Sequence, residues 1–119
     1  MGHGVQGKVR PAELDAETAA AVAETLQALA TPSRLLILGR LRQGPASVGQ
    51  LVETTDLSQS AVSHQLRLLR HLGLVAGDRR GRSVIYSLYD THVAELLDQA
   101  VYHTEHLRLG QRDFPARAG

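Results

Sequence analysis

Hydrophobic residues recur every three to four positions in the first third of the chain, a spacing that predicts amphipathic helices. The first helix is expected over residues 16–28, after Asp15, whose side chain suits the N-cap position. Its apolar stripe consists of Val22, Leu26 and Leu29. A second helix is expected after Thr31, with Pro32 at its first position, where the missing N–H costs nothing, and it ends at Gly44-Pro45.

A short helix, a turn and a longer helix are predicted next. Ser47 can cap the short helix, and residues 55–57 form the turn. The longer helix is expected from Ser58 to Leu72 and ends at Gly73, because glycine favours the C-terminal cap. Its inward side consists of Val62, Leu66 and Leu69. The opposite side of this helix is therefore polar.

The pattern then changes to short β-prone runs. Residues 74–78 and 83–88 predict two strands, which the arginine-rich segment from Arg79 to Arg82 would join as a hairpin. A last helix is expected over Asp90 to Leu109.

This order of elements predicts a mainly α-helical fold with a small β-hairpin. It is typical of a winged helix-turn-helix domain flanked by N- and C-terminal helices, here over residues 15–109. Residues 1–14 lack a periodic pattern and are expected to form a flexible arm. Residues 110–119 are expected to form a flexible tail.

The helix beginning at Ser58 has the composition of a helix that enters the major groove of DNA. Such a helix needs an apolar back and compact hydrogen-bonding side chains near its N-terminus. The candidate contacts to bases or phosphates on this helix are Ser58, Gln59, Ser60, Ser63, His64, Gln65 and Arg67. The alternative is that these side chains only solvate an exposed face, the commoner explanation for any one of them.

The hairpin supports the DNA-binding interpretation. A wing that carries Arg79, Arg80 and Arg82 would grip phosphates or the adjacent minor groove. The net charge of the chain is only +1, but residues 34–82 contain eight arginines and three acidic residues, a balance of +5. The segments on either side are each −2. Segregation of this kind predicts a surface that faces double-stranded DNA.

Composition excludes several other classes of function. The 119 residues include no cysteine, which rules out disulfides, thiolate metal sites and cysteine nucleophiles. There is no apolar stretch long enough to span a membrane and no export signal, so a cytoplasmic protein is expected. Few aromatic residues are available to fill a core, which favours burial of further surface by dimerisation.

Three segments of the chain closely resemble the ArsR/SmtB family of bacterial metal-sensing repressors, and in particular its nickel- and cobalt-sensing branch. They are LQALATPSRLLILGRL from Leu26, SQSAVSHQLRLLRHLGLV from Ser58 and GDRRGRSVIYSLYD from Gly77. The resemblance implies a homodimer built on the first and last helices, which releases operator DNA when metal binds. In that branch the N-terminal arm completes the metal site.

The last helix carries residue types that bind borderline metals. Asp90 and His92 lie at its start, and His103 and His106 lie near its end. One helix cannot bring both ends to one ion, since His92 and His103 are about 16 Å apart along the axis. Two antiparallel copies related by a two-fold axis would pair each start with the partner's end, forming two identical sites. Three imidazoles and a carboxylate suit Ni²⁺, Co²⁺ or Zn²⁺.

The N-terminus offers further ligands. Removal of Met1 would expose the amine of Gly2 beside the imidazole of His3, a pair that forms a compact chelate. Incidental sequence at a mobile end explains Gly2 and His3 equally well. The tail from Arg108 to Gly119 has no histidine, unlike the nickel-sensing relatives, and this departure makes zinc easier to accommodate.

Two alternatives to a metal-released repressor stay open. The first is a winged-helix regulator that a partner protein or another signal controls, with a structural or vestigial metal site. The second is a metal hydrolase, which the sequence supports poorly because it contains no HExxH, G-x-S-x-G or phosphate-binding glycine loop. The expected function is therefore regulatory and not enzymatic.

Overall fold

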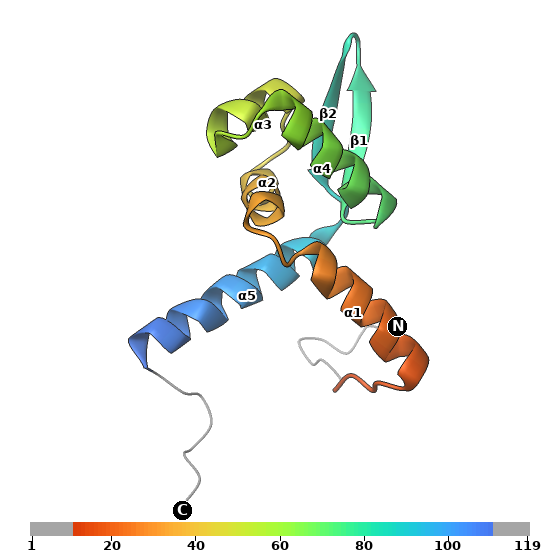
Figure 1. Ribbon diagram of the computed structural model, residues 1–119, viewed down its shortest axis with the longest axis vertical. Coiled ribbons are helices and arrows are strands. Elements are labelled where there is room, and N and C mark those ends of the chain that lie inside the picture. The colour runs from red at the N-terminus through yellow and green to blue at the C-terminus, as the bar shows by residue number, and fades with distance from the viewer. Residues whose placement is uncertain (1–10, 111–119) are drawn as a thin grey trace, which may run out of the picture.

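The computed structural model describes residues 11–110, and these form five helices and one hairpin. Figure 1 shows a compact body with two helices, α1 and α5, extending from its base. The elements in chain order are α1 (Ala16–Ala28), α2 (Pro32–Arg42), α3 (Val48–Thr55), α4 (Gln59–His71), β1 (Val75–Arg80), β2 (Ser83–Leu88) and α5 (Thr91–Leu109). The predicted fold class is confirmed. The predicted arm and tail lie largely outside the described residues.

Polar caps fix where the helices begin. The side chains of Asp15, Thr31, Ser47 and Ser58 each accept a hydrogen bond from a backbone N–H in the first turn of the helix that follows. Ser47 forms a full capping box, because Gln50 also accepts from the Ser47 N–H. These bonds satisfy donors that a helix leaves unpaired, which is why the starts were predictable from sequence.

The core lies between α2, α3 and α4. Fully buried side chains of the three helices meet there, namely Ile37, Leu38, Leu51, Val62, Leu66 and Leu69. Val62, Leu66 and Leu69 form the predicted inward side of α4. The packing holds α4 across the body and leaves its other face exposed.

The hairpin is longer and its loop tighter than the sequence indicated. β1 and β2 pair antiparallel from Val75 opposite Leu88 to Arg80 opposite Ser83. The prediction that Arg79 and Arg80 belong to the loop was wrong, since both extend the strand. Only Gly81 and Arg82 form the turn, and Gly81 has a φ of 63°, which glycine adopts without steric cost.

The base of the wing is joined to the body. Ala46, between α2 and α3, exchanges backbone hydrogen bonds with Tyr86 of β2, at 2.9 and 2.8 Å. Ala46 is completely buried. This bridge fixes the orientation of the hairpin relative to the helices.

Two residues of the apolar stripe of α1 stay exposed among the described residues, whereas Leu29 packs against the core. Val22 and Leu26 are 41% and 50% exposed, and Tyr102 on α5 is 57% exposed. Figure 1 shows both helices extending away from the body. Within the described range, no helix is long and apolar enough to cross a membrane.

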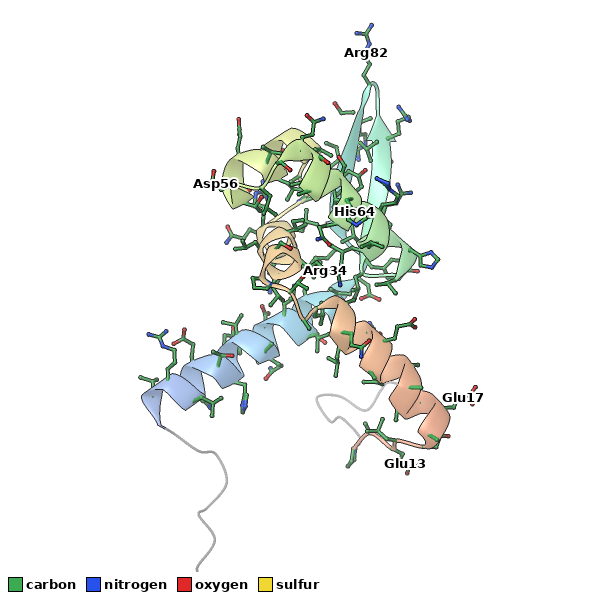
Figure 2. The ribbon with its side chains drawn as sticks, in the orientation of Figure 1. Glu13, Glu17, Arg34, Asp56, His64 and Arg82 are labelled. Carbon is green, nitrogen blue, oxygen red and sulfur yellow. The ribbon has the colours of Figure 1, made fainter. Side chains whose placement is uncertain are left out.

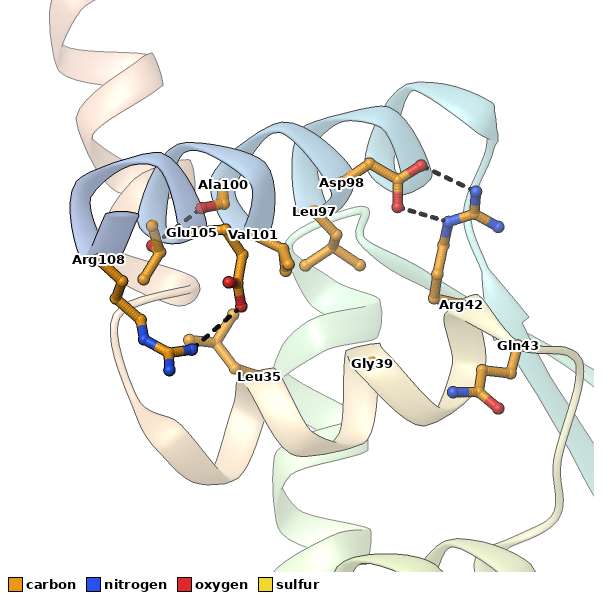
Figure 3. Close-up of a pocket in the computed structure, with 11 residues that line it drawn as sticks. Leu35, Gly39, Arg42, Gln43, Leu97, Asp98, Ala100, Val101, Glu105 and Arg108 are labelled. Carbon is orange, nitrogen blue, oxygen red and sulfur yellow. Dashed lines mark hydrogen bonds and ion pairs between the residues drawn. The ribbon is translucent and has the colours of Figure 1, made fainter. Parts of the chain in front are cut away.

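An ion pair anchors α5 on α2. Both nitrogens of the Arg42 fork donate to Asp98, at 3.0 and 2.8 Å (Figure 3). The pair lines a pocket of about 440 Å³ between the two helices, with Leu35, Leu97 and Val101 among its apolar walls. Hydrogen bonds from Arg42, reinforced by its charge, lower the pKa of the Asp98 carboxyl.

The lowered pKa of Asp98 makes the stability of the chain depend on pH. The stabilisation is complete above the pKa of an unfolded aspartate, about 3.9, and is lost as the pH falls through the lower folded value. We expect Asp98→Asn to lower the urea midpoint modestly at pH 7, and the difference to shrink below about pH 4. Glu95→Gln, the same chemical change at an exposed site on α5, is the control and should leave the midpoint at pH 7 unchanged.

Truncation of a buried side chain on the apolar side of α4 should lower the stability far more than loss of the Arg42–Asp98 pair. Leu66 is 1% exposed, so Leu66→Ala is expected to lower the free energy of unfolding by about 2–5 kcal/mol, through lost burial and the cavity left behind. Urea denaturation at fixed protein concentration measures this. Gln59→Ala on the exposed face of the same helix is the control, and an equal loss in both variants would contradict the packing described.

Candidate functional site

The exposed face of α4 carries most of the predicted DNA contacts. The side chains of Gln59, Ser60, His64 and Arg67 are exposed, and Ser63 is half-buried. Figure 2 shows His64 on the outer side of α4. Ser58 has a structural task as well, since its hydroxyl oxygen accepts a hydrogen bond from the Ala61 N–H at 3.0 Å.

Gln65 departs from the expected outward position. It is half-buried at the flank of the face, and its Oε1 accepts a hydrogen bond from Nε of Arg34 at 2.8 Å. Arg34 lies at the start of α2, thirty-one residues away in sequence. Sequence reasoning missed Arg34, because nothing in the local pattern distinguishes it from any other arginine early in a helix.

The three arginines of the wing differ in how available they are to a phosphate. Arg82 lies at the tip of the hairpin, as Figure 2 shows. Arg80 forms an ion pair with Asp78 at 2.8 Å, whereas Arg79 is exposed. A phosphate that approaches Arg80 must compete with Asp78, so Arg79 and Arg82 are the more available cations.

Asp90 and His92 come together at the start of α5. Asp90 caps the helix, since its Oδ1 accepts from the Val93 N–H at 3.2 Å, and its Oδ2 lies 3.4 Å from Nδ1 of His92. Partial burial acts to raise the pKa of the Asp90 carboxyl, but the bonds from Val93 and His92 outweigh it and lower the pKa. The carboxylate is therefore ionised at neutral pH.

The other predicted ligands lie elsewhere. His103 and His106 are near the far end of α5, and within residues 11–110 no three histidine, aspartate or glutamate side chains gather closely enough to hold a metal ion. Gly2 and His3 lie outside the described residues. Of the predicted ligands at the start of α5, Asp90 and His92 lie together within residues 11–110.

The chain is similar to known bacterial regulators along its whole length. Residues 31–76 match the family model described as "Bacterial regulatory protein, arsR family". The HTH-type transcriptional regulator NmtR of Mycobacterium tuberculosis is 66% identical, over all of both chains. The HTH-type transcriptional repressor SmtB of the same species is 40% identical, over 78% of this chain and 69% of its own.

The chain is also similar to solved structures of bacterial regulators. The solution structure of apo-NmtR has a TM-score of 0.71 and covers 99% of this chain and 100% of its own, at 66% identity. A homodimeric winged helix-turn-helix DNA-binding domain from Mycobacterium bovis, described as a possible ArsR-family transcriptional regulator, has a TM-score of 0.74. It is 27% identical and covers 88% of this chain and 100% of its own.

The exposed wing arginines should determine how steeply DNA affinity falls with salt. Loss of one phosphate contact reduces the slope of log K against log salt by about 0.9, and twice that in a dimer. We expect Arg79→Ala and Arg82→Ala to reduce the slope on any duplex, as measured by fluorescence anisotropy. Arg108→Ala removes the same charge at the far end of α5 and should not. Equal slopes for all four proteins would contradict a DNA-facing wing.

Proposed function

Since this chain belongs to the ArsR family of bacterial regulatory proteins, we propose that it is a homodimeric cytoplasmic repressor that binds operator DNA and releases it when Ni²⁺ or Co²⁺ binds. Zn²⁺ is a third candidate metal. The chain is a transcriptional regulator and not an enzyme. The exposed polar face of α4, held rigidly by a buried apolar back, is the observation that carries the DNA-binding half of the proposal.

Dimerisation is supported by apolar surface that stays exposed within residues 11–110. Val22 and Leu26 on α1 and Val101 and Tyr102 on α5 are large apolar side chains that are 41% to 57% exposed. A second copy would bury them, which contributes about 25 cal/mol per Å² of apolar surface. The homodimeric Mycobacterium bovis domain provides a precedent of the same architecture.

The donor atoms on α5 fit the proposed metals. Asp90 and His92 already lie side by side, and imidazole nitrogens with a carboxylate oxygen suit Ni²⁺, Co²⁺ and Zn²⁺. His103 and His106 of a partner subunit would supply the remaining side chains if the two α5 helices pack antiparallel. The Gly2 amine and the His3 imidazole are the proposed additional ligands.

Metal in this position would link the two α5 helices across the dimer. The Arg42–Asp98 pair fastens α5 to α2, and α2 packs against the core that carries α4. A change in the angle between subunits therefore moves the two α4 helices relative to each other. Because paired half-sites require a fixed spacing, such a change weakens operator binding.

The test is operator affinity across a panel of metals. We expect Ni²⁺ or Co²⁺ to weaken binding by about 5- to 150-fold, the usual range of allosteric coupling, as measured by fluorescence anisotropy at constant salt. His92→Ala and His103→Ala should abolish this effect while leaving metal-free affinity unchanged. Gln99→Ala, an exposed polar position of the same helix, should respond as the wild type does.

Identical affinity with and without each metal would refute the metal response and favour a regulator controlled by a protein or another signal. A His3→Ala variant tests the arm separately. It should retain DNA binding but bind nickel more weakly if the arm contributes ligands, and unchanged nickel affinity would exclude His3.

A further inference from the structure

A partly buried arginine connects the first helix to the DNA-reading helix. The Arg34 guanidinium donates from Nε to Gln65 Oε1 at 2.8 Å and from a terminal nitrogen to the carbonyl oxygen of Ala28 at 3.2 Å. Ala28 is the last residue of α1 and is 3% exposed. Figure 2 shows Arg34 at the junction of α1 and α2. The guanidinium is thus fixed at two points on different helices.

The carbonyl of Ala28 is a favourable partner for a cation. The last carbonyls of a helix have no intrahelical partner and lie at the negative end of the helix dipole. The Arg34 N–H is itself placed by Thr31, the N-cap of α2, at 3.4 Å. Backbone and side chain of Arg34 are therefore both held before any DNA is present.

This arrangement limits what Gln65 can offer to DNA. A guanidinium has only donors, so it must occupy the oxygen of the Gln65 amide and not the nitrogen. A free glutamine reads adenine with both ends of its amide, accepting from N6 and donating to N7. The Gln65 oxygen keeps a second lone pair, but the bond from Arg34 turns this oxygen toward α2, so the side chain presents its N–H donors on the side away from Arg34. In the major groove, guanine offers two acceptors, N7 and O6.

We propose that Arg34 is a positioning residue that commits Gln65 to recognition of acceptor groups, so that each half-site prefers guanine over adenine at the base that Gln65 faces. This inference rests on the proposed function, because it requires that α4 enters the major groove. It assigns a specificity role to a residue of α2 that would not itself contact the base.

The experiment is selection of bound duplexes from a random-sequence DNA library, followed by sequencing. It uses the full-length metal-free wild type and the variants Arg34→Met, Gln65→Ala and the double variant. We expect Arg34→Met to reduce the preference for guanine over adenine about 5- to 150-fold at one position per half-site, the range for one mismatched base pair in a recognition site. Gln65→Ala should affect the same position, and the double variant should select the same motif as Gln65→Ala alone.

Two further variants control for structure and charge. Arg40→Met removes a cation from the same helix whose hydrogen bond goes to the Gly44 carbonyl and not to α4, and it should select the wild-type motif. Arg34→Lys keeps the charge but lacks the fork that spans two partners, so it should change the same base preference as Arg34→Met. Arg34→Lys serves as the decisive variant if circular dichroism shows that Arg34→Met does not fold.

The outcomes separate this inference from the proposed function. An unchanged motif in the decisive Arg34 variant, or a change at a position that Gln65→Ala does not affect, would overturn the inference alone. The affinity of each variant for the selected duplex is measured by fluorescence anisotropy. If Arg34→Met lowers this affinity equally in the wild-type and Gln65→Ala backgrounds, the inference is also overturned, because Arg34 would then contact DNA directly. Failure of the wild type to enrich any sequence would overturn the proposed function and the inference with it.

Discussion

The burial of one side of α4 is the constraint on which the rest of the structure depends. Val62, Leu66 and Leu69 are sealed in the core against α2 and α3, so the helix can neither rotate nor slide without exposing them. Its polar side consequently faces outward in a single orientation. The wing acquires its place from the same body, through the backbone bridge between Ala46 and Tyr86. A surface that reads DNA needs this rigidity, because base contacts tolerate little displacement.

The parts of the fold that depend on neighbouring residues were predictable from sequence. Helix starts at Thr31, Ser47 and Ser58 follow from caps that act within one turn. The hairpin loop was misjudged because charged residues extend β1, and strand pairing does not require apolar side chains at a solvent-exposed edge. The bond between Arg34 and Gln65 could not be predicted, since it joins residues thirty-one positions apart. Such contacts depend on how helices cross, and hydrophobic periodicity does not specify this.

The metal ligands proposed on α5 were predicted from their residue types, and their assembly from an antiparallel pairing of two copies, and both stay predictions. Sequence places Asp90 and His92 at one end of α5 and His103 at the other, and the helix keeps them apart. Their proposed combination requires a second chain, and the sequence of one chain contains no direct record of that geometry. The apolar residues of α1 and α5 point to the same conclusion, because both helices expose side chains that a soluble protein normally covers. The proposed metal site and the proposed dimer interface therefore depend on the same packing of α5.

Asp90 serves two purposes at once, and this affects how its evolution can be interpreted. The carboxylate begins α5 by accepting the Val93 N–H, and it also contacts His92. Selection for helix stability alone would therefore retain Asp90, or an asparagine or serine in its place, in a descendant that no longer sensed anything. The His92 side chain is 86% exposed and has no comparable duty in the helix. If His92 binds metal as proposed, drift at its position among relatives, and not at Asp90, would record the loss of the metal response.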